Sequence, residues 1–120
     1  MYIHTFEKLE VWQLSRKLAV DIYKLCSGFP KEEMFGLSSQ LKRAVISIAS
    51  NIAEGTSRTS GKDKAHFSTV AFASLMEVLN QLIIANDLGF LDAEKLTELR
   101  VSINEISNKL NALRKSQMSS

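Results

Sequence analysis

The chain has 120 residues, of which 45% are hydrophobic and 23% charged. These proportions are typical of a folded domain and argue against disorder. Fifteen basic and thirteen acidic residues leave a formal net charge of +2, which argues against a strongly basic nucleic-acid-binding protein. The single cysteine, Cys26, excludes an internal disulfide and a cysteine-built zinc site, and it indicates a reducing compartment.

The first predicted helix covers about residues 6–27. Apolar residues recur there at spacings of three and four, which puts them on one face of a helix: Val11, Leu14, Leu18, Ile22 and Leu25. Gly28 and Pro30 are turn signals that end this helix. Residues 31–36 are expected to form a short helical turn.

The second helix is predicted over about residues 37–54, where the apolar residues again share one face: Leu41, Val45, Ile48 and Ile52. Gly55 follows it and suits a helix end in the left-handed conformation. The third helix is predicted over about residues 61–88. Ser60 is its expected N-cap, Asp63 resembles the acid of a capping box, and Gly89 follows its end.

The fourth helix is predicted over about residues 93–115, after Asp92 as N-cap and before a frayed end at residues 116–120. Its apolar seam alternates spacings of three and four: Leu96, Leu99, Ile103, Ile106, Leu110 and Leu113. Short links favour antiparallel neighbours. The predicted fold is therefore all-α, an antiparallel up-down-up-down four-helix bundle, in one domain over residues 1–120.

No targeting or membrane segment is recognised in the sequence. The N-terminus has no basic start followed by an apolar run. The longest stretch without Asp, Glu, Lys or Arg is residues 65–76, which is too short to span a bilayer. We therefore expect a cytoplasmic protein without a membrane partner.

The third helix carries more apolar residues than one bundle core needs. One stripe contains Phe67, Ala71, Leu75, Val78, Leu82 and Ala85, and a second lies roughly 130° around the helix and contains Phe72, Met76, Leu79 and Ile83. A central helix that touches two neighbours explains this pattern, and so does an external partner. The second stripe is thus a hypothetical oligomer interface.

The sequence contains few features that indicate an enzyme. A di-iron bundle needs two Glu-x-x-His pairs and further carboxylates, whereas this chain offers only the related pair Asp63 and His66 at a helix start. Neither a zinc-ligand spacing nor a phosphate-binding glycine loop nor a nucleophile elbow is present. We assign no catalytic residue, metal or cofactor. A small metal- or cofactor-binding bundle enzyme remains the alternative, which metal analysis of the purified protein tests.

Two charge patterns yield hypotheses about contacts. In an antiparallel pair, second-helix and third-helix residues whose numbers sum to about 117 to 120 lie level, so Arg43 and Glu77 are predicted to form a structural ion pair. Basic residues also gather at the bundle end that holds the second link and the C-terminus: Arg58, Lys62, Lys64, Arg114 and Lys115. Acidic residues outnumber basic ones at the other end. The basic end is a hypothetical phosphate-contacting site, with an ordinary solvated surface as the alternative.

Several motifs resemble a known family. They include Phe6, Leu9, Val11-Trp12-Gln13, Phe29-Pro30, Phe35-Gly36-Leu37, Gln40-Leu41, Arg43-Ala44, Ser47-Ile48, Asn51-Ile52-Ala53-Glu54-Gly55 and Arg58. The likeness continues through Phe67, Ala71, Ser74, Glu77, Gln81-Leu82, Ala85 and Leu88-Gly89. Together they resemble the 23S rRNA intervening-sequence protein family of small bacterial four-helix bundles.

This resemblance implies a non-enzymatic bundle that assembles as a homo-oligomer, often a five-fold ring. The family is similar to the accessory protein of diversity-generating retroelements, which binds nucleic acid and a reverse transcriptase. The function expected from the resemblance is therefore a homo-oligomeric protein, with a pentamer as one form, that binds RNA or other nucleic acid or acts as a scaffold. A purely protein–protein interaction module is the further alternative.

Overall fold

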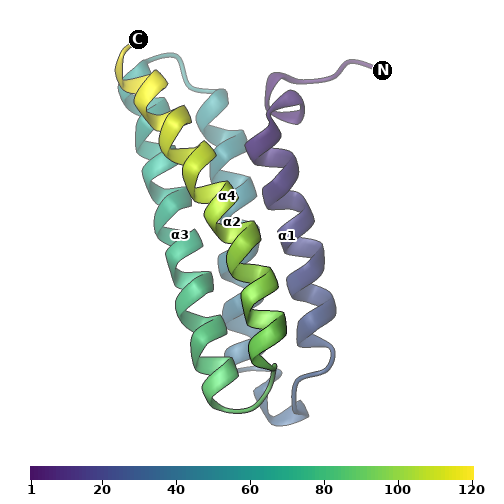
Figure 1. Ribbon diagram of the computed structural model, residues 1–120. Coiled ribbons are helices and arrows are strands. Elements are labelled where there is room, and N and C mark those ends of the chain that lie inside the picture. Colours follow the sequence, from purple (N-terminus) through teal and green to yellow (C-terminus); the bar gives the residue numbers. More distant parts are fainter.

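Four long helices run up and down along one common direction in the computed structural model, which describes all 120 residues (Figure 1). They are α1 (Glu10–Cys26), α2 (Leu37–Thr56), α3 (Gly61–Asp87) and α4 (Ala93–Met118). Two short 3₁₀ turns, η1 (Thr5–Lys8) and η2 (Lys31–Glu33), precede α1 and α2. The chain has no strand, so the predicted all-α four-helix bundle is confirmed.

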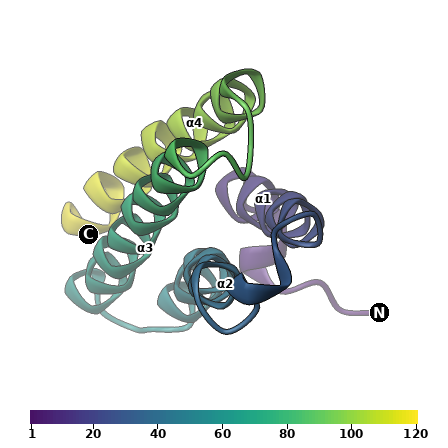
Figure 2. The same cartoon turned by 90° about the horizontal axis from the view of Figure 1, so that it is seen from below.

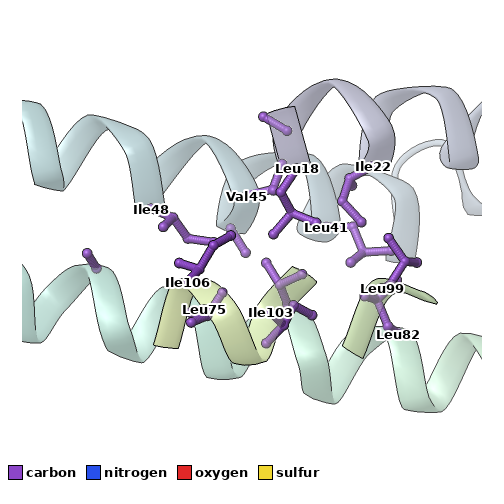
Figure 3. Packing of buried hydrophobic residues seen from close by; sticks show 14 of the residues in the cluster. Leu18, Ile22, Leu41, Val45, Ile48, Leu75, Leu82, Leu99, Ile103 and Ile106 are labelled. Carbon is purple, nitrogen blue, oxygen red and sulfur yellow. The ribbon is translucent and has the colours of Figure 1, made fainter. Parts of the chain in front are cut away.

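The core lies along the bundle axis, where the four helices surround it (Figure 2). Figure 3 shows how aliphatic side chains from all four helices interdigitate there. Ile22, Leu41, Ile48, Leu82 and Ile103 are among the fully buried ones. Burial of each such side chain stabilises the fold by about 2 kcal/mol. The apolar spacings of three and four therefore identify the core correctly.

Two predicted N-caps are confirmed, but one glycine acts differently from the expectation. The backbone N–H of Asp63 donates to Ser60 Oγ at 3.1 Å, and that of Lys95 donates to Asp92 Oδ1 at 2.8 Å. Gly55 lies inside α2 and has no positive φ. A Cβ there would meet Phe67 Cβ at 3.0 Å, so this glycine is needed for the close approach of α2 to α3 rather than for a left-handed helix end.

The end of α4 also differs from the expectation. Residues 116–118 are helical rather than frayed, because Gln117 is buried against the start of α3. Ser68 Oγ donates to Gln117 Oε1 at 2.6 Å, and the backbone of Gly61 packs directly on the Gln117 carbonyl. This contact fixes the C-terminal turn of α4 to the first turns of α3.

The second apolar stripe of α3 is partly covered within the single chain. Phe72, Met76 and Leu79 are half-buried and pack against the core, and the Arg114 guanidinium of α4 lies 5.9 Å from the Phe72 ring centre. Contact with two neighbours therefore accounts for much of the double pattern.

By length and composition α3 would also pass as a membrane-crossing helix, a property that core helices of soluble bundles share.

Candidate nucleic-acid interface

The α2–α3 link, the end of α4 and the start of α1 lie at one end of the bundle (Figure 1). A hollow at this end is lined mainly by short or polar side chains, including Thr5, Thr56, Ser116 and Gln117. Lys64 lines the same hollow and is half-buried. The antiparallel arrangement thus brings Arg58, Lys62, Lys64, Arg114 and Lys115 to this end, although they come from separate parts of the chain.

Arg58 is the one member of this basic set that has an acidic partner. Its Nη2 lies 3.0 Å from Glu54 Oε1, one helical turn earlier in α2. Its guanidinium also lies over the Phe67 ring, 4.6 Å from the ring centre. These two contacts hold the planar group against the α2 side of α3, and its side chain remains 42% exposed.

The other four cations form no ion pair. None of the four, Lys62, Lys64, Arg114 and Lys115, has a carboxylate oxygen within 4.0 Å of its charged nitrogen atoms. Lys62 and Lys115 are also exposed. Arg114 Nη2 donates instead to Asn111 Oδ1 at 3.3 Å. The positive charge of these side chains is therefore not neutralised by direct contacts.

Two of the four carboxylates at the same end, Glu7 and Glu10, contact groups outside the basic set. Glu7 Oε2 accepts from the His4 backbone N–H at 2.8 Å, and Glu10 Oε1 lies 3.3 Å from Lys109 Nζ. Glu54 holds Arg58. Asp63, in the first turn of α3, is the acidic residue nearest in sequence to the unpaired lysines.

The basic side chains lie around the N-terminal part of α3 and do not form a flat patch. Arg58 stacks on Phe67 and Arg114 lies over Phe72. These two aromatic residues are five positions apart on α3 and so point about 140° from each other. A strand of RNA that contacts both arginines would therefore have to pass around the end of the bundle.

The predicted ion pair between Arg43 and Glu77 is absent. The polar contacts between α2 and α3 are Ser47 Oγ to Ser74 Oγ at 2.8 Å and Gln81 Nε2 to Gln40 Oε1 at 3.5 Å. Arg43 and Glu77 lie between these two contacts in sequence, but both are exposed and neither belongs to any ion pair. Glu77 accepts a hydrogen bond from Gln81 instead, at 3.3 Å.

Cys26 lies in the core at the end of α1. Burial raises the pKa of its thiol, an effect opposed by the positive charge of Lys42 and by the hydrogen bond to Ser38. A buried thiol with a raised pKa is a poor nucleophile. No three His, Cys, Asp or Glu side chains gather closely enough to hold a metal ion.

A second surface was not expected from the sequence. Val20, Tyr23 and Ile46 are exposed where α1 and α2 run side by side, and they adjoin Met34 and Phe35 of the connection between these helices. The sequence alone shows only that Val20, Tyr23 and Ile46 lie outside the core stripes of their helices. In single helices such residues are common, so only the packing of α1 on α2 shows that they gather.

Comparisons with known proteins give a family and a fold. No curated protein matches the sequence. The structure is similar to the crystal structure of a protein with unknown function from the S23 ribosomal protein family of Bacteroides thetaiotaomicron VPI-5482. The TM-score is 0.81 at 24% identity, over 88% of this chain and 95% of the other, which shows a shared fold. The sequence model of the 23S rRNA-intervening sequence protein matches residues 7–112, and the chain therefore belongs to that family.

Proposed function

We propose that this protein is a non-enzymatic, homo-oligomeric bundle that binds RNA through phosphate contacts at its basic end. The observation that carries the proposal is the group of unpaired cations, Lys62, Lys64, Arg114 and Lys115, around the start of α3 and the end of α4. Unpaired Lys and Arg side chains are the groups that neutralise phosphates. Membership of a family named after an rRNA insertion adds support for RNA as the polyanion.

Oligomerisation gives this modest charge a useful affinity. A net charge of +2 per chain predicts weak binding by one copy. A closed ring repeats the basic end around its axis, and several linked sites bind far more tightly than one. The second α3 stripe, Phe72, Met76, Leu79 and Ile83, is only half-buried within one chain, and we assign its exposed part to contact between copies.

Fluorescence polarisation with a labelled structured RNA tests the proposed function. The variant Lys62→Glu with Lys115→Glu removes two exposed cations that make no ion pair, so its fold should be unchanged. Its RNA affinity at low salt should fall at least tenfold. The matched control, Lys31→Glu with Arg100→Glu, makes the same change in charge away from the basic end and should bind RNA nearly as well as the parent chain.

The salt dependence of binding provides a second test. Phosphate contacts release counterions, so each contact makes the affinity vary nearly in inverse proportion to the salt concentration. Three or four contacts would therefore lower the affinity by about a hundredfold between 50 and 200 mM salt. Equal loss in both double variants, or binding that does not depend on salt, would contradict an RNA site at the basic end.

A further inference from the structure

A groove with exposed apolar side chains lies between α1 and α2, away from the basic end. It consists of two adjoining hollows that share Tyr23 and Ile46. Val20 lines one hollow, and Met34 and Phe35 line the other. Phe35 is 93% exposed and Met34 is 57% exposed, although both residue types are usually buried. An exposed group of this kind marks an interaction surface.

The connection before α2 holds Phe35 in this exposed position. Backbone N–H groups of Glu33, Met34 and Gly36 donate to carbonyls three residues earlier, at 2.9 to 3.1 Å. Glu33 Oε1 also accepts from the backbone N–H of Leu37 at 3.2 Å, which ties the turn to the start of α2. The aromatic side chain is therefore presented by a hydrogen-bonded turn, so a partner need not order a loose loop to bind it.

Every charged residue that lines the groove is basic. These residues are Lys24, Lys42 and Arg43, and no carboxylate lines either hollow. Lys42 Nζ lies 5.1 Å from the Tyr23 ring centre, and none of the three cations belongs to an ion pair. Asp21, the nearest carboxylate of α1, is held by Lys17 at 3.1 Å and lines a different hollow beside α4.

We propose that this groove binds an acidic amphipathic helix of a partner protein. An apolar groove between two antiparallel helices accepts the apolar face of a third helix. The three cations at its edge then favour a helix whose apolar stripe is flanked by Glu or Asp. Five exposed apolar residues against three cations favour such a helix over a nucleic acid, because RNA contacts are dominated by phosphates.

Neither the groove itself nor the acidic face of α4 supplies this complement in a second copy of the chain. Two grooves placed face to face would bring Lys24, Lys42 and Arg43 of one copy against those of the other, which opposes a symmetric dimer through this surface. The acidic face of α4 carries Glu94, Glu98 and Glu105, and Val101, 64% exposed, is its one exposed large hydrophobic residue. A helix that fills the groove needs several apolar residues on one face.

A pair of designed peptides tests the proposal with the full chain. The first is a labelled amphipathic helix that has leucines at i, i+4, i+7 and i+11 and glutamates on both sides of this stripe. The second has lysine in place of every glutamate. In fluorescence anisotropy, the acidic peptide should bind saturably and at least tenfold more tightly than the basic peptide. Equal binding, or no binding of the acidic peptide, would refute the proposal.

Variants of the groove provide the second part of this test. Phe35→Ser with Ile46→Ser should weaken binding of the acidic peptide at least tenfold, and Phe35→Ser alone serves if the double variant does not fold. The matched control, Val101→Ser with Leu88→Ser, changes exposed apolar residues elsewhere and should leave binding unchanged. Lys42→Glu with Arg43→Glu should reverse the preference, so that the basic peptide binds more tightly.

Other occupants of the groove predict different outcomes. If light scattering shows that Phe35→Ser dissociates an oligomer of this chain, a second copy occupies the groove and the proposal is wrong. If a labelled RNA is displaced by the acidic peptide and loses affinity in Phe35→Ser, the groove is a nucleic-acid site and the proposal is also wrong. RNA binding that depends on Lys62 and Lys115 alone leaves the two surfaces separate, as proposed.

Discussion

The basic end and the α1–α2 groove both present unpaired cations, but the residues around those cations differ. At the basic end the hollow is lined by Leu9 and Leu113 together with Lys64 and small or polar residues, Thr5, Thr56, Ser116, Gln117 and Ser120, and it has no aromatic residue. In the groove, Tyr23, Phe35 and Ile46 surround the charges. The sign of the charge is the reason that we propose an anionic partner in both places. The neighbouring side chains then determine whether a phosphate chain or an apolar helix face fits better.

Both surfaces depend on α2, because Arg58 follows its C-terminus and Ile46 lies at its centre. Gly55→Leu should disturb this shared framework most, because Phe67 and the Lys64 carbonyl leave no room for a side chain. We expect a loss of about 2 to 3 kcal/mol in the free energy of unfolding, or roughly 10 °C in melting temperature. Thermal denaturation followed by circular dichroism measures it.

Gly28→Ala is the control for this substitution. A Cβ at Gly28 would make only an ordinary contact, 3.6 Å from the Leu25 carbonyl, so its stability should be nearly unchanged. If Gly55→Leu has the same melting temperature as the parent chain, close packing of α2 on α3 does not restrict the size of the side chain at position 55.

The next effect separates the two surfaces by charge. Lys62→Glu with Lys115→Glu should lower RNA affinity at least tenfold, because two phosphate contacts are replaced by repulsion. Affinity for the acidic peptide should change less than twofold, since the two lysines lie outside the groove. Polarisation titrations with each labelled ligand measure the two effects. A parallel loss of both ligands would mean that charge acts over the whole molecule rather than at two sites.

The serine pair between α2 and α3 should have a smaller effect. Ser47 Oγ and Ser74 Oγ are 2.8 Å apart, and Asn51 Nδ2 also donates to Ser47 Oγ at 2.9 Å. A double-mutant cycle of Ser47→Ala and Ser74→Ala should give a coupling of about 1 kcal/mol. Urea denaturation of the four proteins measures it. A coupling of zero would show that these hydroxyls do not help to fix the register of the two helices.

The smallest expected effect is on the stability of the groove variant. Phe35 is almost fully exposed, so Phe35→Ser removes no core contact and should change the free energy of unfolding by less than about 0.5 kcal/mol. Chemical denaturation measures it. A loss above 1 kcal/mol would mean that Phe35 stabilises the fold, and its exposure would then need no partner as an explanation.

The sequence predicted most of the fold because its signals are local. Spacings of three and four identified buried residues such as Leu41 and Ile103, and Ser60 and Asp92 marked two helix starts. Gly55 was misinterpreted because a glycine that permits close helix approach looks the same in sequence as one that ends a helix. The extension of α4 through Gln117 depends on a hydrogen bond to Ser68 of α3, which no local pattern reveals.

The candidate sites were harder to predict, because they depend on which side chains reach one another. The antiparallel order of helices correctly brought Arg58, Lys62 and Lys115 to one end. The same reasoning put Arg43 level with Glu77 but gave no information on side-chain direction, and the ion pair is absent. The groove requires Tyr23, Phe35 and Ile46 from three segments to meet, and the sequence has no period that connects them.

The central claim is that this bundle has two separate cationic surfaces. Competition between the two ligands tests this claim most directly. A labelled structured RNA is first bound to the full chain, and the unlabelled acidic peptide is then added to saturation while polarisation is recorded. We predict that the RNA stays bound and that its affinity changes less than twofold, because Lys62 and Lys115 lie away from Lys42 and Arg43. Displacement of the RNA at peptide concentrations that fill the groove would contradict the account.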